Sequence, residues 1–503
     1  MARDSVGNTY LLGAEANYVI LLKINPAGSI VWKRHYMTQG QNWIRNVFVD
    51  KQGNINIFFT QGNLYFIKYN QNGDSIASKK LDVIFNSSTS TNIKVNENNE
   101  IYVAGTYTNI ATHIKDYIIL KLDINFSTIW QYKESHPLSE INNAELNDLC
   151  FDYKGNVYFC GSDALASIGD TSNIFVTKLK PTGLFEWRRD FANIQTHSYS
   201  KNILCDSKGF VYISGMYYLP STIINAKSIL IKYNSLGKLQ WYKYYHDSLM
   251  TNTDFTPIDM KMDNNGNFII GGVMYMGNGN SNGEDFLILK YSSAGVLNGD
   301  YYFGGRSQDV LYSIDIDNKN NIYATGYKWT FDSIGHSIDK KTYTVKVNST
   351  GQTVWETTYI PPLFEGRGGT TAKKIIIDKF ENIFLACDGN IIDYSTDIYC
   401  IKYNQIVNIF PPEYLQNFSL LQNYPNPFNP STNIEFYIFE SGFYEIKIYD
   451  ITGKIIGKLI QKSLIAGNYK ITWNAFNNAS GIYFYSLYKD GKKLDLKKMI
   501  LLK

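Results

Sequence analysis

Six stretches of the sequence combine an aspartate with a nearby glycine or asparagine, residue types that could bind calcium or phosphate. DYKGNVYFCG, from Asp152, is typical, and related stretches begin at Asp50, Asp206, Asp263, Asp317 and Asp378. A calcium loop needs several converging oxygen ligands, whereas most copies offer one carboxylate. A phosphate cradle needs a following helix, which is absent from the pattern. We therefore expect no metal and no cofactor at these stretches.

The same stretches are well suited to turning the chain. Asp152 can accept a hydrogen bond from the backbone N–H two residues on, and Gly155 can supply the positive φ of a tight hairpin. Six copies of one motif indicate a structural repeat rather than a single site.

Other candidates for catalysis are weak. GNSNG at 279–283 matches the G-x-S-x-G pattern, but a nucleophile elbow requires a strand-to-helix turn and this segment reads as a polar loop. The six histidines are scattered without zinc-ligand spacing. Residues brought together from distant repeats leave no local motif, so an enzyme remains an open alternative.

The five cysteines, at 150, 160, 205, 387 and 400, lie in strand-like runs without C-x-x-C spacing. This favours buried, unpaired cysteines. Cys150 and Cys160 flank one predicted hairpin, and a disulfide between them is the alternative.

Composition excludes some partners. A net charge of +3 over 503 residues indicates no nucleic-acid partner. No apolar run approaches the roughly 18 residues of a transmembrane segment. The 40 tyrosines and 28 phenylalanines favour strands.

Repeats of about 45 to 60 residues organise most of the chain, each with four short β-rich runs. The third run has a lysine near its end, at Lys23, Lys68, Lys121, Lys178, Lys232, Lys290, Lys346 and Lys402. The fourth often has a tryptophan, at Trp32, Trp130, Trp187, Trp241 and Trp355. Four-stranded units in series predict the blades of an all-β propeller. Residues 7 to 404 resemble a β-propeller repeat family known from seven-bladed members.

The second and third β-rich runs of the repeat each occur eight times, whereas the first and fourth runs each occur seven times. This count predicts eight blades, with seven as the alternative, the first lacking its innermost strand and the last its outermost. We expect a segment missing before residue 1, and the start MARDSVGNTY also lacks the apolar core of a signal peptide.

A second domain follows a proline-rich boundary. We predict a propeller over 1–405, a linker over 406–417 and a small β-sandwich over 418–503. The last segment resembles the type A C-terminal sorting domain of the type IX secretion system. The matching residues include Tyr424, Pro425, Asn426, Pro427, Phe428, Asn429 and Pro430, then Ser480, Gly481, Tyr483 and the terminal Lys503.

This resemblance implies an immunoglobulin-like sandwich, recognised by the type IX translocon and cut by a sortase-like peptidase. It implies that the protein passes through the periplasm and is secreted or attached to the outer-membrane surface.

The connections that vary most in length all fall on one face of the predicted propeller, where functional loops usually gather. Aromatic and arginine residues on this face predict a ligand-binding site, comprising Tyr217, Tyr218, Trp329, Phe331, Arg306 and Arg367. We expect a secreted binding or structural module for a glycan, peptide or other surface polymer. The alternative is a glycan-active hydrolase or lyase acting in the propeller channel.

Overall fold

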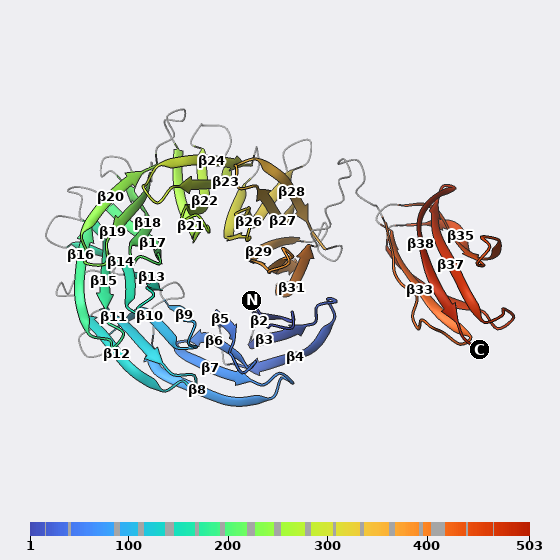
Figure 1. The fold of residues 1–503 in the computed structure, drawn as a ribbon, viewed down its shortest axis with the longest axis horizontal. Coiled ribbons are helices and arrows are strands. Elements are labelled where there is room, and N and C mark those ends of the chain that lie inside the picture. The colour runs from blue at the N-terminus through green and yellow to red at the C-terminus, as the bar shows by residue number, and fades with distance from the viewer. Residues whose placement is uncertain are drawn as a thin grey trace. The chain divides into compact units, whose positions relative to one another are not determined.

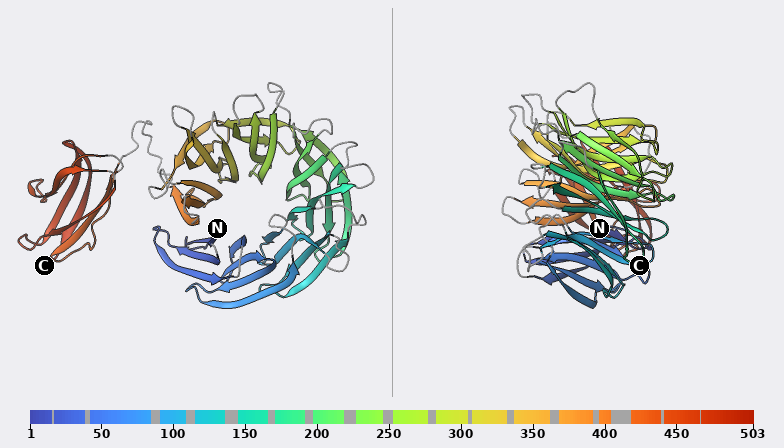
Figure 2. Two further views of the ribbon diagram at one scale, coloured as in Figure 1. Left: turned by 180° about the vertical axis from the view of Figure 1, so that it is seen from behind. Right: turned by 90° about the vertical axis from the view of Figure 1, so that its left-hand side faces the viewer.

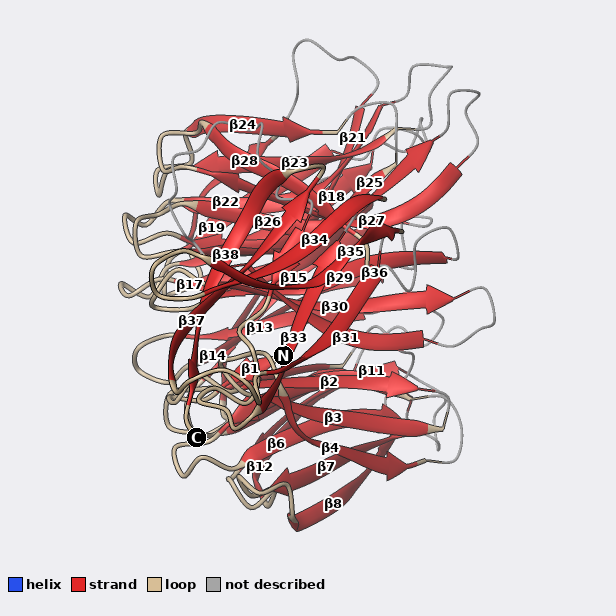
Figure 3. Ribbon diagram, turned by 90° about the vertical axis from the view of Figure 1, so that its right-hand side faces the viewer, coloured by secondary structure: helices blue, strands red, loops and turns tan. Residues whose placement is uncertain are grey.

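The computed structural model contains β-strands and no helix among the residues that it describes (Figure 3). These residues are 1–15, 17–38, 42–84, 91–108, 115–135, 145–165, 171–191, 197–218, 227–245, 253–276, 283–304, 308–331, 337–361, 368–391, 396–403, 418–438, 441–465 and 467–503. The chain divides into two compact units, Met1–Gln405 and Ile406–Lys503.

The first unit is a ring of antiparallel sheets, which confirms the predicted β-propeller (Figures 1 and 2). Blade 1 contains β1 (Ala2–Arg3), β2 (Thr9–Glu15), β3 (Tyr18–Ile24) and β4 (Ile30–Met37). Blade 2 contains β5 (Trp43–Val49), β6 (Ile55–Gln61), β7 (Asn63–Tyr69) and β8 (Ser75–Ile84). Blade 3 contains β9 (Asn92–Val95), β10 (Ile101–Thr108), β11 (Lys115–Leu122) and β12 (Thr128–Ser135). Blade 4 contains β13 (Glu145–Phe151), β14 (Val157–Leu165), β15 (Thr171–Leu179) and β16 (Phe185–Phe191).

The second half of the ring repeats the pattern. Blade 5 contains β17 (His197–Cys205), β18 (Val211–Tyr218), β19 (Lys227–Tyr233) and β20 (Leu239–Tyr244). Blade 6 contains β21 (Thr253–Met262), β22 (Phe268–Met276), β23 (Glu284–Tyr291) and β24 (Leu297–Phe303). Blade 7 contains β25 (Asp309–Ile316), β26 (Ile322–Phe331), β27 (Ser337–Val347) and β28 (Thr353–Tyr359). Blade 8 has three described strands, β29 (Gly368–Ile377), β30 (Ile383–Ile391) and β31 (Thr396–Tyr403).

Blade 1 differs from the sequence prediction. Its innermost strand is present as the two-residue β1, followed by a complete turn from Asp4 to Asn8. The six copies of the aspartate motif include neither this turn nor the turn of blade 3, where Asn96 replaces the aspartate.

The repeated aspartates turn the chain as predicted. The carboxylate of Asp152 accepts hydrogen bonds from the backbone N–H groups of Lys154 at 2.9 Å and Asn156 at 3.0 Å. Its second oxygen accepts the hydroxyl of Tyr158 at 3.1 Å. Gly155 has a φ of 77°, which a side chain would strain. One aspartate thus anchors the turn and fixes a tyrosine of the next strand.

The repeated lysines and tryptophans join neighbouring blades. In blade 4, Lys178 Nζ and Trp187 Nε1 both donate to the carbonyl of Ser235 in blade 5, at 3.1 and 3.2 Å. The same arrangement closes the ring, because Lys402 of blade 8 donates to the carbonyl of Pro26 in blade 1 at 3.2 Å.

A disulfide also links two blades. Cys150 in blade 4 is bonded to Cys205 in blade 5, across a sequence separation of 55. The alternative pairing of Cys150 with Cys160 is therefore wrong, and so is the expectation that all five cysteines are unpaired. Adjacent innermost strands bring Cys150 and Cys205 together, a proximity that spacing within one hairpin cannot reveal. Cys160, Cys387 and Cys400 are free.

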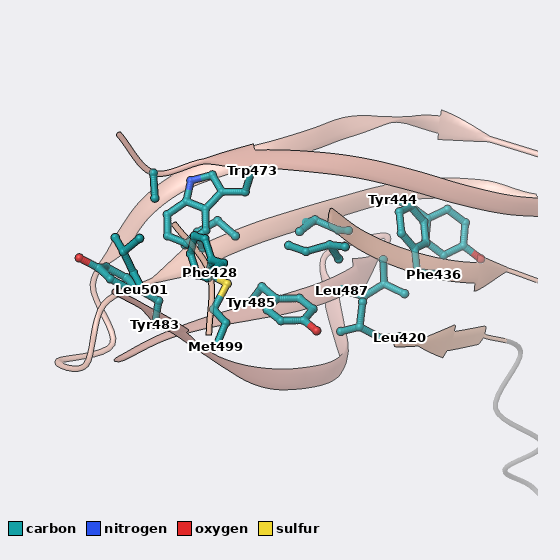
Figure 4. Packing of buried hydrophobic residues seen from close by; sticks show 14 of the residues in the cluster. Leu420, Phe428, Phe436, Tyr444, Trp473, Tyr483, Tyr485, Leu487, Met499 and Leu501 are labelled. Carbon is teal, nitrogen blue, oxygen red and sulfur yellow. The ribbon is translucent and has the colours of Figure 1, made fainter. Parts of the chain in front are cut away.

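The second unit has two sheets. One contains β32 (Phe418–Leu420), β33 (Ser431–Ile438) and β36 (Gly467–Asn474). The other contains β34 (Gly442–Tyr449), β35 (Ile455–Leu464), β37 (Gly481–Lys489) and β38 (Lys492–Leu501). Buried side chains from both sheets form one hydrophobic core, including Phe436, Trp473, Tyr485 and Met499 (Figure 4). The immunoglobulin-like topology expected from the resemblance stays a prediction.

Candidate functional site

The predicted ligand-binding residues do not form one cluster among the described residues. Tyr217 and Tyr218 end β18 in blade 5, whereas Trp329 and Phe331 belong to β26 in blade 7. All four lie in strands, although the sequence pattern placed them outside the strand register. The ring of Tyr217 packs against Tyr244 with 4.3 Å between centroids, and burial raises its pKa. Tyr217 is therefore mainly a packing residue. Arg306 and Arg367 lie outside the described residues.

A different group of side chains meets where blades 7 and 8 adjoin. Lys340 Nζ lies 3.9 Å from the ring centroid of Tyr327, and Lys373 Nζ lies 3.9 Å from that of Tyr312. The two tyrosine rings are 6.1 Å apart. Lys373 Nζ is also 3.8 Å from a carboxylate oxygen of Asp388. We call these five residues the blade 7–8 cluster.

Bulges in the innermost strands position two members of this cluster. The pairing of β25 with β26 shifts register between Leu311 and Ser313, which leaves Tyr312 as the extra residue. The pairing of β29 with β30 shifts between Ala372 and Lys374, which leaves Lys373 as the extra residue. A bulge adds one residue to a strand and changes the direction of its side chain. Blades 7 and 8 thus place a tyrosine and a lysine at equivalent positions.

Backbone contact between the blades brings Lys340 close to the other members. A parallel bridge pairs Lys340 of β27 with Gly369 of β29, so that the sheets of blades 7 and 8 are continuous. A Cβ atom on Gly369 would lie 2.5 Å from Cβ of Lys340. Glycine at 369 is therefore required for this close approach.

Polar and aromatic groups extend the cluster toward blade 6. Tyr275, near the end of β22, has 41% of its surface exposed, and it lies close enough to Tyr327 to raise the pKa of that residue. Gln308 Nε2 donates to Glu284 at 2.6 Å, and the backbone carbonyl of Gln308 accepts the N–H of Trp329 at 3.1 Å. Trp329, one of the predicted residues, is the cross-strand partner of Lys340 and therefore borders the cluster.

The cluster has unusual electrostatics. Burial, and then the positive charge of Lys373, lower the pKa of Lys340. Burial raises the pKa of Asp388 even though Lys373 and Lys340 act in the opposite direction. Burial raises the pKa of Tyr327 to about 12, so its ring stays neutral. The ammonium groups of Lys340 and Lys373 thus both act on the carboxylate of Asp388, in a site from which water is partly excluded.

A cavity of about 680 Å³ adjoins the blade 8 side of the cluster. Its charged lining residues are Arg45, Lys94, Lys373, Lys374 and Asp388. Apolar side chains, including Leu11, Val47 and Ile398, line other parts of the wall. A cavity of this size and composition fits a ligand with both polar and apolar faces.

Sequence reasoning missed Tyr275, Tyr312, Tyr327, Lys340 and Lys373. The only available signal was the extra residue in the innermost runs, and a bulge cannot be placed until the pairing register is known. No group of three or more potential metal ligands occurs within the described ranges.

In the second unit, the YPNPFNP segment holds the last strand. Phe428 donates its N–H to the carbonyl of Ile500 at 3.0 Å and accepts the N–H of Leu502 at 3.0 Å. Asn426 Oδ1 accepts the N–H of Ile500 at 2.9 Å. The peptide bonds before Pro425 and Pro427 are both cis. The segment predicted to be a sorting motif therefore forms hydrogen bonds along the edge of β38.

Other predicted sorting residues lie at the same end of this unit. The N–H of Lys503 donates to Ser480 Oγ at 2.9 Å, and Lys503 Nζ donates to the carbonyl of Phe476. Gly481 begins β37, and Tyr483 donates its hydroxyl to the carbonyl of Ala479 at 2.7 Å. Two parts of the motif separated by about 50 residues in sequence thus converge on the chain end.

Within the YPNPFNP segment, exposure differs sharply from residue to residue. Phe428 is 2% exposed, and its ring centroid lies 5.5 Å from that of Trp473. Figure 4 shows the two side chains next to each other in the core. Tyr424 is 80% exposed. Pro425, Pro427 and Asn429 are also exposed, whereas Asn426 and Pro430 are half-buried. One segment thus combines a buried anchor with an exposed aromatic ring.

Comparison with protein families finds a secretion system C-terminal sorting domain over residues 422–502. No curated protein matches the chain significantly. No helix in the described ranges is long and apolar enough to span a membrane.

Several solved structures are similar to the chain. PorZ, an essential surface component of the type IX secretion system of Porphyromonas gingivalis, is 11% identical over 98% of this chain and 87% of its own, with a TM-score of 0.26. The WD40 domain of SCAP from fission yeast is 8% identical over 78% and 96%, with a TM-score of 0.39. A protein of unknown function from Bacteroides caccae is 10% identical over 59% and 94%, with a TM-score of 0.33.

The sorting-domain match covers the residues whose motif and packing are described above, and the domain directs proteins to the cell surface or the medium. The chain is therefore a secreted or cell-surface β-propeller that carries a C-terminal sorting domain of the type IX secretion system.

Proposed function

We propose that the propeller is a binding module for an extracellular polymer, which it holds on the blade 7–8 cluster and the adjoining tyrosine of blade 6. The observation that carries this proposal is the row of contacts from Lys340 through Tyr327 and Tyr312 to Lys373. Aromatic rings with cationic neighbours offer flat apolar contact and directed polar contact at once.

The carboxylates near the cluster favour binding over catalysis. Asp309 is paired with Lys328 at 3.0 Å, Asp388 lies near Lys373, and Glu284 accepts a hydrogen bond from Gln308. A glycosidase needs two carboxylates that flank the scissile bond, one of them free to donate a proton. Asp309 and Glu284 are held by these contacts, so they offer no such pair, which favours binding over the hydrolase alternative.

The second part of the proposal concerns export and is based on the sorting-domain match. We propose that the protein crosses the periplasm, that the type IX translocon recognises the sorting domain, and that a sortase-like peptidase removes it. The exposed Tyr424, whose backbone pairs with Asn433 of β33, suits recognition by such a partner, because exposed aromatic side chains often anchor interfaces.

The experiment that tests the binding proposal uses the purified full chain and a panel of polysaccharides and peptides, with both retention and product release measured. We expect retention without products. Tyr275→Ala and Tyr312→Ala should each weaken retention by roughly fivefold or more, the loss of about 1 kcal/mol or more of ring contact. Tyr153→Ala is the matched control, because Tyr153 is 67% exposed on a turn at the opposite face of the ring.

Released products would support the enzyme alternative. Retention that is unchanged in both variants would show that the ligand binds elsewhere on the chain.

A further inference from the structure

We infer that the polymer bound at the blade 7–8 cluster is an acidic polysaccharide, with its anionic groups held between the ammonium groups of Lys340 and Lys373. This inference rests on the proposed function above and names the ligand class for the same site.

The first reason is the charge imbalance within the cluster. The positive charge of Lys373 acts on Lys340, and the cluster contains one carboxylate, that of Asp388, 3.8 Å from Lys373 Nζ. Each ammonium group lies over a tyrosine ring. Two partly desolvated like charges repel each other, and an anion placed between them removes that repulsion.

The second reason is the basic lining of the adjoining cavity. Four cationic side chains and one carboxylate line it. Two of these cations are neutralised by acids of other blades, since Lys94 pairs with Asp148 at 2.7 Å and Lys374 with Asp259 at 3.7 Å. Arg45, the extra residue of the bulge in β5, donates to the hydroxyl of Thr60. Cationic side chains thus line the cavity next to the cluster, while Asp148, Asp259 and Asp388 offset the charges of Lys94, Lys374 and Lys373.

The third reason favours sugar over peptide. The rings of Tyr312 and Tyr275 are partly exposed on neighbouring blades, and flat aromatic rings stack on the apolar faces of pyranoses. Glu284 lies beside Tyr275, and Asp388 lies 3.8 Å from Lys373 Nζ, so carboxylate groups that can accept hydrogen bonds from hydroxyls are near the rings. Sugar stacking and anion binding are thus available within one site.

The test compares polygalacturonate with highly methyl-esterified pectin, in which methyl esters remove most of the charge from the same galacturonan backbone. Binding of the full chain is measured by affinity electrophoresis and calorimetry, with poly-glutamate as the peptide arm. We expect polygalacturonate to bind at least about tenfold more tightly than the ester, and to weaken as salt rises. The double variant Lys340→Gln, Lys373→Gln should lose about tenfold in affinity for polygalacturonate.

The matched control is the double variant Lys154→Gln, Lys208→Gln, which removes the same charge from two exposed turns on the opposite face. It should bind like the unaltered chain. Equal binding of the acid and its ester, with the cluster tyrosines still required, would overturn the acidic ligand while leaving the proposed function intact. Tighter, lysine-dependent binding of poly-glutamate would overturn the polysaccharide assignment. If the chain retained neither these polymers nor any member of the polysaccharide and peptide panel, the proposed function itself would be refuted.

Discussion

Replacing Phe428 with alanine should unfold or loosen the sorting domain. The side chain is 2% exposed, belongs to the hydrophobic core and packs against Trp473. Truncating a buried phenylalanine costs about 3–5 kcal/mol, through lost burial and the cavity left behind. Small domains have about 5–15 kcal/mol of total stability. The loss is therefore a large share of what holds β38 in place.

Tyr424→Ala is the matched comparison from the same segment. Its side chain is 80% exposed, and its backbone bonds with Asn433, both 3.0 Å, do not depend on the ring. Surface substitutions of this kind change stability by about 0.5 kcal/mol or less. The two variants therefore separate a defect in folding from a defect in recognition.

Two measurements distinguish these effects. Hydrogen exchange of the purified full chain should show lost protection over residues 418–503 in Phe428→Ala and native protection in Tyr424→Ala. Export is then followed in a cell that has the type IX system, with a signal peptide placed before the chain. We expect both variants to remain in the periplasm, the first because the domain is loosened and the second because the exposed ring is lost. Native protection in Phe428→Ala would refute the packing argument, and normal export of Tyr424→Ala would refute a role for its ring in recognition.

Other predictions concern the propeller. Asp206→Ala removes hydrogen bonds to the N–H groups of Lys208 and Phe210 and to the hydroxyl of Tyr212, and should cost about 1–3 kcal/mol in denaturant unfolding with no calcium dependence. Replacing both Cys150 and Cys205 by serine should destabilise the ring by about 4 kcal/mol, from the closure of a loop of 55 residues; an unchanged denaturation midpoint would contradict this. Lys402→Met should raise hydrogen exchange in blades 1 and 8 alone, because it removes the bond to Pro26. Burial raises the pKa of Asp378, but hydrogen bonds from Asn382 and Arg3 outweigh it and bring that pKa below 3.8. This carboxylate therefore stabilises the fold above pH 3.8 and ceases to do so as the pH falls through the lowered pKa; Arg3→Met should make acid unfolding shallower.

The repeat explains why so much of the propeller was predictable. Turn geometry is set within a few residues, so Asp152 and Gly155 could be assigned from the sequence alone. The lysine and tryptophan positions recur because every blade meets its neighbour in the same way, as Lys178 and Trp187 show. Local rules repeated many times give a strong pattern.

The site was less predictable because it depends on register and on contacts between blades. Lys373 is a bulge residue, and Lys340 reaches Tyr327 across paired strands. The disulfide between Cys150 and Cys205 likewise joins equivalent positions of different blades. Composition and local pattern encode neither the register of a hairpin nor a contact between different blades.

The closure of the ring has a kinetic consequence. Most blades pack against the blade that follows directly in sequence, but Arg3 pairs with Asp378 across 375 residues, and Lys402 reaches Pro26 across 376. Contacts of such long range are slow to form, because a long stretch of chain must be ordered first. The seam between blades 1 and 8 is therefore expected to form last during folding and to open first under stress. Until it forms, β2 and β31 each present an uncovered face, and the propeller is most exposed to aggregation in that interval.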